Sequence, residues 1–150
     1  MITGLHIETT NKCTLKCPRC SRTEFIEQFP KSWTNKELDI DAFKKFFNLE
    51  NLKISLNGTY GDSIYYSNLF ELIKFLKSKD CKISISTNGS YQTKEWWQEL
   101  GSILDEQDQI VFGIDGLPEN FTTYRINADW TSIKLGIKTL KDYDVKLVWQ

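Results

Sequence analysis

Two periodicities of apolar residues alternate along this chain. Short apolar or β-branched runs, typical of β-strands, are separated by longer stretches in which apolar residues recur every three or four positions, as in amphipathic helices. From the second run onward, the strands start at intervals of about thirty residues, the length of a βαβ unit. The predicted strands cover residues 5–9, 52–56, 82–86, 110–114 and 145–149.

The stretches between these strands each predict a helix. Ser67 and Thr93 stand at the starts of two of them, where a hydroxyl oxygen can accept a hydrogen bond from a free backbone N–H group. Helices between consecutive strands imply parallel pairing with right-handed crossovers, so the sequence predicts an α/β fold. The apolar faces comprise Ile40, Phe43 and Phe47; Leu69, Leu72, Ile73 and Leu76; Trp96, Trp97, Leu100, Ile103 and Leu104; and Trp130, Ile133, Ile137 and Leu140.

The two ends of this pattern differ from its middle. The first crossover, residues 10–51, is longer than the others and opens with a cluster of cysteines. Loops at the carboxyl ends of parallel strands are where α/β folds carry their chemistry. The sequence ends inside the fifth strand, which would leave an exposed sheet edge. We therefore expect residues 1–150 to be the N-terminal majority of one core domain that is incomplete at its C-terminus.

Composition narrows the class of protein. The chain has 150 residues, of which 40% are hydrophobic and 13% aromatic, so an intrinsically disordered chain is excluded. Nineteen basic and 20 acidic residues leave a net charge of −1, so no whole-domain positive field marks nucleic acid as a partner. No apolar run approaches the ~18 residues of a membrane span, and no signal peptide opens the chain. We expect a protein of the reducing cytoplasm.

The four cysteines divide into a triplet and a single residue. Cys13, Cys17 and Cys20 lie in one loop, whereas Cys81 opens the third strand, where we expect a small buried hydrophobe. A reducing compartment favours metal or cluster ligands over disulfides for clustered thiols. Structural zinc prefers four ligands and would need His6 or Cys81 as the fourth, although His6 is expected to be an ordinary strand residue. Three thiolates on an iron–sulfur cube would leave one iron open to a ligand that is not protein.

The spacing Cys-x3-Cys-x2-Cys after a first strand resembles the radical S-adenosylmethionine (radical SAM) superfamily. Three further segments match in the order expected for that family. Residues 56–62 resemble its Gly-Gly-Glu segment with Asp62 in the last place, and residues 86–89 resemble its Thr-Asn-Gly turn. Residues 113–116 with Arg125 resemble the Ser-Leu-Asp-Gly and downstream Arg of the branch that often carries a C-terminal auxiliary-cluster domain, the SPASM type.

The resemblance implies a fold, two cofactors and a reaction. The fold is a partial (β/α) barrel, of which this chain covers the first four to five βα units. The cofactors are a [4Fe–4S] cluster on Cys13, Cys17 and Cys20, and S-adenosylmethionine on the remaining iron. Reductive cleavage of S-adenosylmethionine gives a 5′-deoxyadenosyl radical that abstracts a hydrogen atom from substrate. The family oxidoreductases take their electron from a reductant such as flavodoxin or ferredoxin, and the branch indicates a peptide or protein substrate.

The resemblance also implies roles for residues that would hold S-adenosylmethionine. Asp62 would accept a hydrogen bond from the methionyl ammonium group, and Arg125 would pair with the methionyl carboxylate. Gly58 and Gly61 would let the backbone approach the cofactor closely or adopt a positive φ. Asn88 belongs to the Thr-Asn-Gly turn that the family places at this site.

Three positions depart from the family pattern. Arg19 precedes the third cysteine where an aromatic residue is common, and its guanidinium would stack near the adenine instead. Asp62 is one methylene shorter than the usual Glu. Gly113 replaces a Ser that contacts the ribose in related proteins, so that hydrogen bond would be missing.

Two other functions are compatible with the sequence. The first is a non-enzymatic α/β interaction module in which the three cysteines and one further ligand hold zinc or a cluster. The second is a piece that binds cluster and cofactor but does not turn over substrate, because the substrate contacts lie in a part that is absent. The identity of the fourth ligand and the products formed from S-adenosylmethionine discriminate between these functions.

Overall fold

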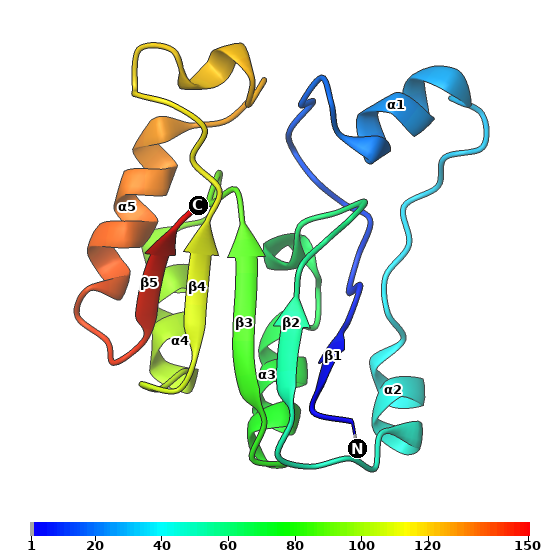
Figure 1. Ribbon diagram of the computed structural model, residues 1–150, viewed down its shortest axis with the longest axis vertical. Helices are drawn as coiled ribbons and strands as arrows, with labels where there is room; N and C mark the ends of the chain where they lie inside the picture. Colours follow the sequence, from blue (N-terminus) through cyan, green and yellow to red (C-terminus); the bar gives the residue numbers. More distant parts are fainter. Residues whose placement is uncertain (1) are drawn as a thin grey trace.

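A five-stranded parallel sheet with helices packed on it forms this molecule (Figure 1). The structure is a computed structural model that describes residues 2–150. The strands are β1 (Gly4–His6), β2 (Lys53–Leu56), β3 (Lys82–Thr87), β4 (Gln109–Phe112) and β5 (Lys146–Trp149). The helices are α1 (Ser21–Gln28), α2 (Ile40–Phe46), α3 (Leu69–Lys77), α4 (Lys94–Ile103) and α5 (Trp130–Leu140), with short 3-10 turns η1 (Ser63–Tyr65) and η2 (Phe121–Thr123).

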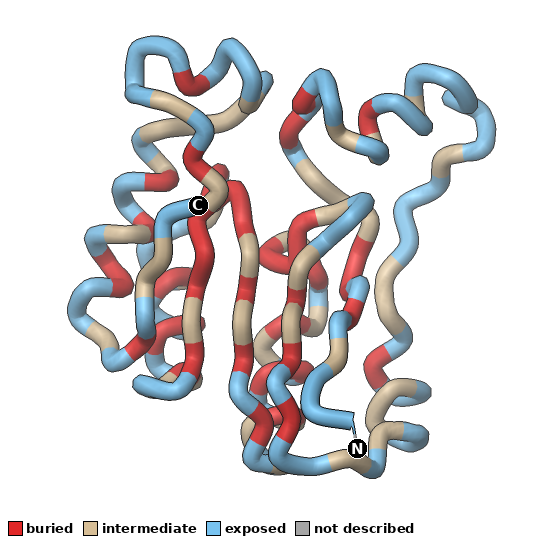
Figure 2. Tube along the Cα trace, in the orientation of Figure 1, coloured by how far each residue is buried: buried red, intermediate tan, exposed pale blue. Residues whose placement is uncertain are grey.

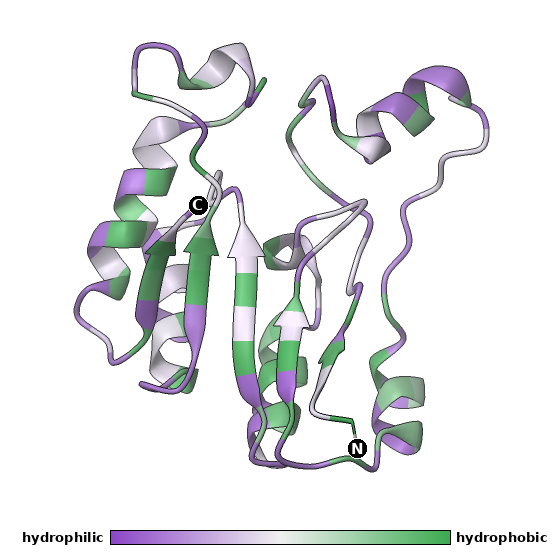
Figure 3. Ribbon diagram, viewed as in Figure 1, coloured by the Kyte–Doolittle hydropathy of each residue, from purple (hydrophilic) through white to green (hydrophobic). Residues whose placement is uncertain are grey.

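The strands lie side by side in sequence order, as expected for successive right-handed βαβ crossovers. One row across the sheet pairs Leu56 with Ile85 and Ile85 with Ile110, and all three side chains are fully buried. Residues on either side of this row in each strand are less buried, as Figure 2 shows along β2 and β3. Figure 3 shows the same alternation as hydropathy. The predicted α/β fold with a parallel sheet is confirmed.

The helices α3, α4 and α5 cover one face of the sheet, shown behind it in Figure 1. Trp97 of α4 is fully buried against Phe112 of β4, while Trp96 and Trp130 pack at the border of the core, as their helical spacing predicted. Cys81 is almost completely buried in this core. The prediction that it is a small buried hydrophobe is therefore confirmed.

The two predicted helix caps have different outcomes. Thr93 caps α4, because its side-chain oxygen accepts a bond from the Trp96 amide at 3.2 Å. The predicted cap at Ser67 is wrong: α3 begins at Leu69, and the Ser67 hydroxyl donates to the Glu37 carboxylate at 3.1 Å. The N-cap position is Asn68, one residue later, so Ser67 lies outside the cap and its hydroxyl is oriented toward the carboxylate.

The first strand is shorter than the sequence predicts. It ends at His6, and Ile7 adds one more bond from its amide to Ser55 O. Beyond that point Thr9 and Thr10 turn away and pair with residues 36–38, with Leu38 N donating to Thr9 O. The chain thereby leaves the sheet and enters the cysteine loop. Within residues 2–150, no helix combines the length and apolarity that a membrane span requires.

Candidate active site

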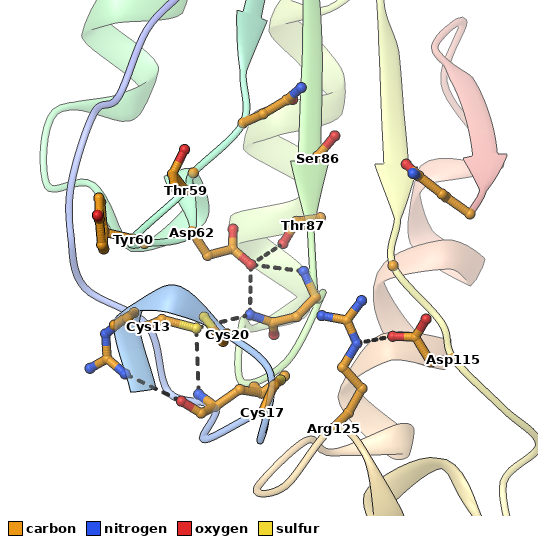
Figure 4. Close-up of a pocket in the computed structure, with 18 of the residues that line it drawn as sticks. Cys13, Cys17, Cys20, Thr59, Tyr60, Asp62, Ser86, Thr87, Asp115 and Arg125 are labelled. Atoms are coloured by element: carbon orange, nitrogen blue, oxygen red, sulfur yellow. Dashed lines mark hydrogen bonds and ion pairs between the residues drawn. The ribbon is translucent and has the colours of Figure 1, made fainter. Parts of the chain in front are cut away.

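A cavity of about 320 Å³ opens at the carboxyl ends of the strands, the end at which parallel sheets collect their functional loops (Figure 4). The loops after β1, β2, β3 and β4 all contribute to its wall. Its lining includes Cys13, Cys17, Cys20, Arg22, Gly58, Tyr60, Gly61, Asp62, Thr87, Asn88, Gly113, Asp115, Tyr124 and Arg125. The four segments that the sequence singled out are therefore brought together.

The cysteine loop presents three free thiols to this cavity. Cys13 Sγ accepts from the Leu15 amide at 3.5 Å, and the Cys20 amide donates to Cys17 O at 3.1 Å, so the loop is held as a turn before α1. Burial raises the pKa of the Cys13 thiol to about 11, and the negative charge of Asp62 adds to this rise. Burial also raises the pKa of Cys17, against the positive charge of Arg125. Metal binding to such thiols displaces their protons.

Asp62 forms the wall of the cavity opposite Arg125 (Figure 4). Its carboxylate is buried and accepts hydrogen bonds from the Asn88 amide at 2.7 Å, the Asn88 side chain at 2.6 Å, the Thr87 hydroxyl at 3.0 Å and the Ile64 amide at 3.2 Å. All four donors are neutral groups. Burial raises the pKa of this carboxyl to about 6, although these bonds oppose the rise. A buried carboxylate without a bonded cation favours a cationic ligand.

Asn88 connects this carboxylate to the cysteine loop. Its side-chain amide donates to Asp62 Oδ2 and also lies 3.7 Å from Cys13 Sγ, while its own oxygen accepts from the Ser90 amide at 2.9 Å. The Asp62 amide in turn donates to Lys12 O at 2.8 Å. The loops after β1, β2 and β3 are thus joined directly beside the thiols.

Gly58 and Gly61 are required by the chain itself. A Cβ on Gly58 would lie 1.8 Å from Gly61 O, and one on Gly61 would lie 2.0 Å from Thr10 O. Neither glycine has a positive φ, so that part of the expectation is wrong. Their missing side chains let the loop fold tightly on itself and on the cysteine loop, which brings Asp62 to the wall.

The β4 side of the cavity carries the positive charge. Arg125 donates through Nε to Asp115 Oδ2, and both residues line the cavity. A Cβ on Gly113 would lie 2.8 Å from Arg125 Nη2. The space left by the Gly113 departure from the family pattern is therefore occupied by the guanidinium of Arg125.

Three residues considered from the sequence lie elsewhere. Arg19 is exposed and is not among the residues that line the cavity. His6 lies in β1, as expected, with its ring bonded to the backbone oxygen of Asn57. Cys81 lies at the opposite end of β3 from the cysteine loop. Neither candidate for a fourth zinc ligand is thus beside the three thiols.

Sequence reasoning missed two cavity residues and a helix. Arg22 of α1 lines the cavity, donates to Leu15 O at 3.3 Å and lies 5.4 Å from the centre of the Trp33 ring. Helix α1 buries only Thr23, so it has no apolar face that periodicity could detect. Asp115 lay within the matched segment 113–116, but only its pairing with Arg125 gives it a role.

Comparison with known proteins agrees with this geometry. The sequence model of the radical SAM superfamily matches residues 7–149, which is nearly the whole chain. The chain belongs to the radical SAM superfamily. Enzymes of this superfamily use a [4Fe–4S] cluster and S-adenosylmethionine.

Two curated relatives match most of the chain. One is a tungsten-containing aldehyde ferredoxin oxidoreductase cofactor-modifying protein of Pyrococcus furiosus, 28% identical over 76% of this chain and 31% of its own length. The other is the antilisterial bacteriocin subtilosin biosynthesis protein AlbA of Bacillus subtilis, 27% identical over 71% of this chain and 22% of its own length. The chain thus spans about a third or less of these relatives.

Two solved structures share the radical SAM fold. Methylornithine synthase (PylB) superposes with a TM-score of 0.68 over 99% of this chain and 44% of its own, at 12% identity. BtrN, solved in complex with AdoMet and 2-DOIA, gives a TM-score of 0.57 over 100% of this chain and 57% of its own, at 14% identity. The predicted partial (β/α) barrel is confirmed as the fold class.

The residues present fit the radical SAM cofactors. Three soft thiols from one loop are the donor type that iron–sulfur clusters use. The buried Asp62 carboxylate and the Arg125 guanidinium face one cavity from opposite walls, as a ligand with one ammonium and one carboxylate requires. Among residues 2–150, no three His, Cys, Asp or Glu side chains converge closely enough to hold a single metal ion.

Proposed function

We propose that this chain is the cofactor-binding part of a radical SAM enzyme, with Cys13, Cys17 and Cys20 as the cluster ligands. One observation supports this most strongly: three thiols, a buried carboxylate without a bonded cation and a guanidinium line a single cavity. When bound, the cluster supplies the electron that cleaves S-adenosylmethionine to methionine and a 5′-deoxyadenosyl radical, which abstracts a hydrogen atom from substrate.

Asp62 and Arg125 would hold the two charged groups of the methionyl moiety. Asp62 Oδ2 already accepts three bonds, whereas Oδ1 accepts only the long bond from the Ile64 amide, so Oδ1 has capacity for the ammonium group. Arg125 uses Nε for Asp115 and also hydrogen-bonds the Cys17 thiol, so its Nη side would take the carboxylate once Cys17 holds the cluster. Asp62 comes from the loop after β2 and Arg125 from the segment after β4, so the two sides of the cavity would each hold one charged group of the cofactor.

The other residues would complete the binding site. Gly58 and Gly61 let the loop after β2 fold tightly beside the cofactor, Asn88 lies between the thiols and Asp62, and Gly113 leaves room for Arg125. Stacking of Arg19 on the adenine remains a prediction and requires its exposed side chain to turn toward the cavity. Arg22, already in the cavity wall, is a second cation for the same role.

We further propose a peptide or protein substrate for the whole enzyme. The support is the branch motif at residues 113–116 and the similarity to AlbA, a protein named for the biosynthesis of a bacteriocin. A reductant such as flavodoxin or ferredoxin would supply the electron. The four free cysteines favour a reducing compartment such as the cytoplasm for this oxidoreductase.

Anaerobic reconstitution tests the cofactor assignment. We expect about four iron and four sulfide per chain. Reductant and S-adenosylmethionine should then yield 5′-deoxyadenosine and methionine, with or without substrate turnover. Asp62→Asn should keep the cluster but bind S-adenosylmethionine ~10- to 100-fold more weakly, because a charge-assisted hydrogen bond contributes ~1.5–3 kcal/mol. Asp142→Asn removes an exposed charge at the turn after α5 and serves as the matched control.

Stoichiometric zinc without sulfide would contradict the proposal and favour the metal-binding module. A fully loaded cluster with no cleavage of S-adenosylmethionine would contradict the enzymatic assignment. Cleavage by the whole enzyme without modification of any peptide would leave the cofactor chemistry intact and contradict only the substrate class.

A further inference from the structure

Asp115, in the loop after β4, has no part in the cofactor contacts proposed above. Its carboxylate accepts the Nε–H of Arg125 at the wall of the cavity. The Asp115 side chain is 41% exposed and that of Arg125 25% exposed, so the pair lies at the rim rather than in the core. An ion pair this exposed contributes little to folding stability. Its effect must be sought in the orientation of the guanidinium.

A guanidinium carries five N–H donors in one rigid plane. The bond from Nε to Asp115 occupies one edge of this plane, and the rest of the guanidinium lies toward the cavity, where it also hydrogen-bonds the Cys17 thiol. In Figure 4, Asp115 lies on one side of Arg125, and the far end of the guanidinium turns toward the side where Thr87 and Asp62 lie. Nη2 lies where a Cβ on Gly113 would be only 2.8 Å away. Gly113 therefore permits this orientation and Asp115 selects it.

Both partners stand on anchored backbone. Next to Asp115, the Ile114 amide donates to Gln150 O at 2.9 Å, and Ile114 O accepts from the Trp149 indole at 2.9 Å. The Arg125 amide donates at 3.1 Å to the backbone oxygen of Phe121, whose ring is fully buried against Trp130. The pair thus joins two fixed points, and holding the guanidinium requires little further loss of conformational entropy.

We infer that Asp115 is a positioning residue, which holds Arg125 so that its Nη groups face the methionyl carboxylate of S-adenosylmethionine. The inference rests on the proposed function, in which Arg125 binds that carboxylate. The opposite role makes an opposite prediction. If Asp115 only competed with the ligand for the guanidinium, its removal would free Arg125 and tighten binding.

Equilibrium binding to the anaerobically reconstituted chain decides between these roles. The two probes are S-adenosylmethionine and 5′-methylthioadenosine, which has the adenosine part but neither the methionyl carboxylate nor the ammonium group. We expect Arg125→Ala to weaken S-adenosylmethionine binding ~100-fold and Asp115→Ala ~10-fold, since bidentate charge-assisted contacts depend on geometry. Asp115→Asn, which can still accept the Nε–H bond, should fall between Asp115→Ala and the native chain. Binding of 5′-methylthioadenosine should change less than about twofold throughout.

A structural role for Asp115 would weaken both probes alike, so the difference between the probes is the decisive readout. The double variant Asp115→Ala with Arg125→Ala should bind no more weakly than Arg125→Ala alone, because Asp115 acts through Arg125. Gly113→Ala disturbs the same orientation from the other side and should weaken only S-adenosylmethionine. Gly113→Ala therefore still tests whether the orientation of Arg125 controls S-adenosylmethionine binding if the Asp115 variants fail to fold. Asp142→Asn is the matched charge control.

Unchanged or tighter S-adenosylmethionine binding by Asp115→Ala would overturn the inference, as would equal losses for both probes. In those cases a native chain that still binds S-adenosylmethionine through Arg125 leaves the proposed function standing. A native chain that binds neither probe overturns the proposed function, and the inference with it.

Discussion

A buried aspartate lies at each end of strand β3, and the two have opposite surroundings. At the amino end, Asp108 accepts from the Ile83 amide at 2.7 Å, the Asp105 amide at 3.0 Å and the Lys77 ammonium at 2.7 Å. At the carboxyl end, Asp62 accepts from the Asn88 amide at 2.7 Å and from other neutral donors. The first carboxylate has its counter-ion within the fold, whereas the second has its nearest bonded partners all uncharged.

This difference in charge balance is typical of a structural site at Asp108 and of a ligand-binding site at Asp62. Burial lowers the pKa of Lys77, but its hydrogen bonds to Asp105 and Asp108 outweigh this and raise it overall, so the ion pair is internally balanced. Asp62 is left with a carboxyl whose pKa burial raises to about 6. A buried charge that the fold does not balance is destabilising, and a cationic ligand removes that penalty. A cationic ligand at the carboxyl end of the sheet would therefore stabilise the fold, in agreement with the proposed role of Asp62.

The largest expected effect concerns the cysteines, which also divide between the two ends of β3. Replacing Cys13, Cys17 or Cys20 by Ala should abolish incorporation of iron and sulfide, because a cluster cannot be held by two thiolates from this loop. Cys81→Ala, at the other end of β3, should keep the full cluster and lose ~1 kcal/mol of stability as a buried side chain is shortened. Iron and sulfide analysis after reconstitution checks both. Equal iron loss in Cys81→Ala would contradict the division of the cysteines into three cluster ligands and one core residue.

The next largest effect concerns stability at the amino end of the sheet. Asp108→Ala should destabilise the fold by about 3 kcal/mol, because it leaves the Ile83 amide without its acceptor and Lys77 half buried without its buried partner. Chemical denaturation of the cofactor-free chain measures this. Asp105→Asn, which alters only the more exposed partner of Lys77, is the matched control and should lose less than ~1 kcal/mol. Similar losses in both variants would contradict a special role for Asp108.

At the carboxyl end of the sheet, the stability of the cofactor-free chain should increase as pH falls. The pKa of Asp62 is raised, so between pH ~4 and ~6 the folded chain binds this proton more tightly than the unfolded chain, and stability rises as pH falls. Asp62→Asn should remove this rise and stabilise the cofactor-free chain at pH 7 by ~1–3 kcal/mol, since one pKa unit corresponds to ~1.4 kcal/mol.

The quantity to measure is the difference in unfolding free energy between the native chain and Asp62→Asn from pH 4 to pH 8. Hydrogen bonds to Lys77 and Ser132 lower the pKa values of Asp105 and Asp129, whose effect on stability runs the other way and cancels in this difference. A difference that does not change with pH would contradict a raised pKa of Asp62 in the folded chain.

The smallest expected effect tests the connection between Asp62 and the thiols. Asn88→Ala removes the side-chain N–H group that lies 3.7 Å from Cys13 Sγ, and hydrogen bonds to ligating sulfur contribute to the potential of a cluster. We expect the midpoint potential to become more negative by ~60 mV or less, which is a tenfold change for a one-electron couple. An EPR-monitored redox titration measures it. Thr87→Val also removes a donor to Asp62 but leaves Cys13 alone, so it should not shift the potential.

Much of this molecule follows from local patterns. Short apolar runs and helical spacings predicted five strands and the helices α2 to α5 close to their observed positions, because each buries one face in the core. The strand order follows from right-handed crossovers between neighbours. Helix α1 escaped prediction because it buries only Thr23. The predicted Ser67 cap was wrong because the helix begins two residues later, at Leu69, with Asn68 in the N-cap position.

The sequence by itself determined the fold class and singled out the residues that we propose to carry the chemistry, since the cysteine spacing and the motif after each strand are local properties of the chain. Only the tertiary structure decided which neutral groups surround Asp62, that Gly113 makes room for Arg125, and that Asp115 holds it. These are contacts between loops that follow different strands. Their geometry depends on how the sheet aligns its carboxyl ends, which no local spacing encodes.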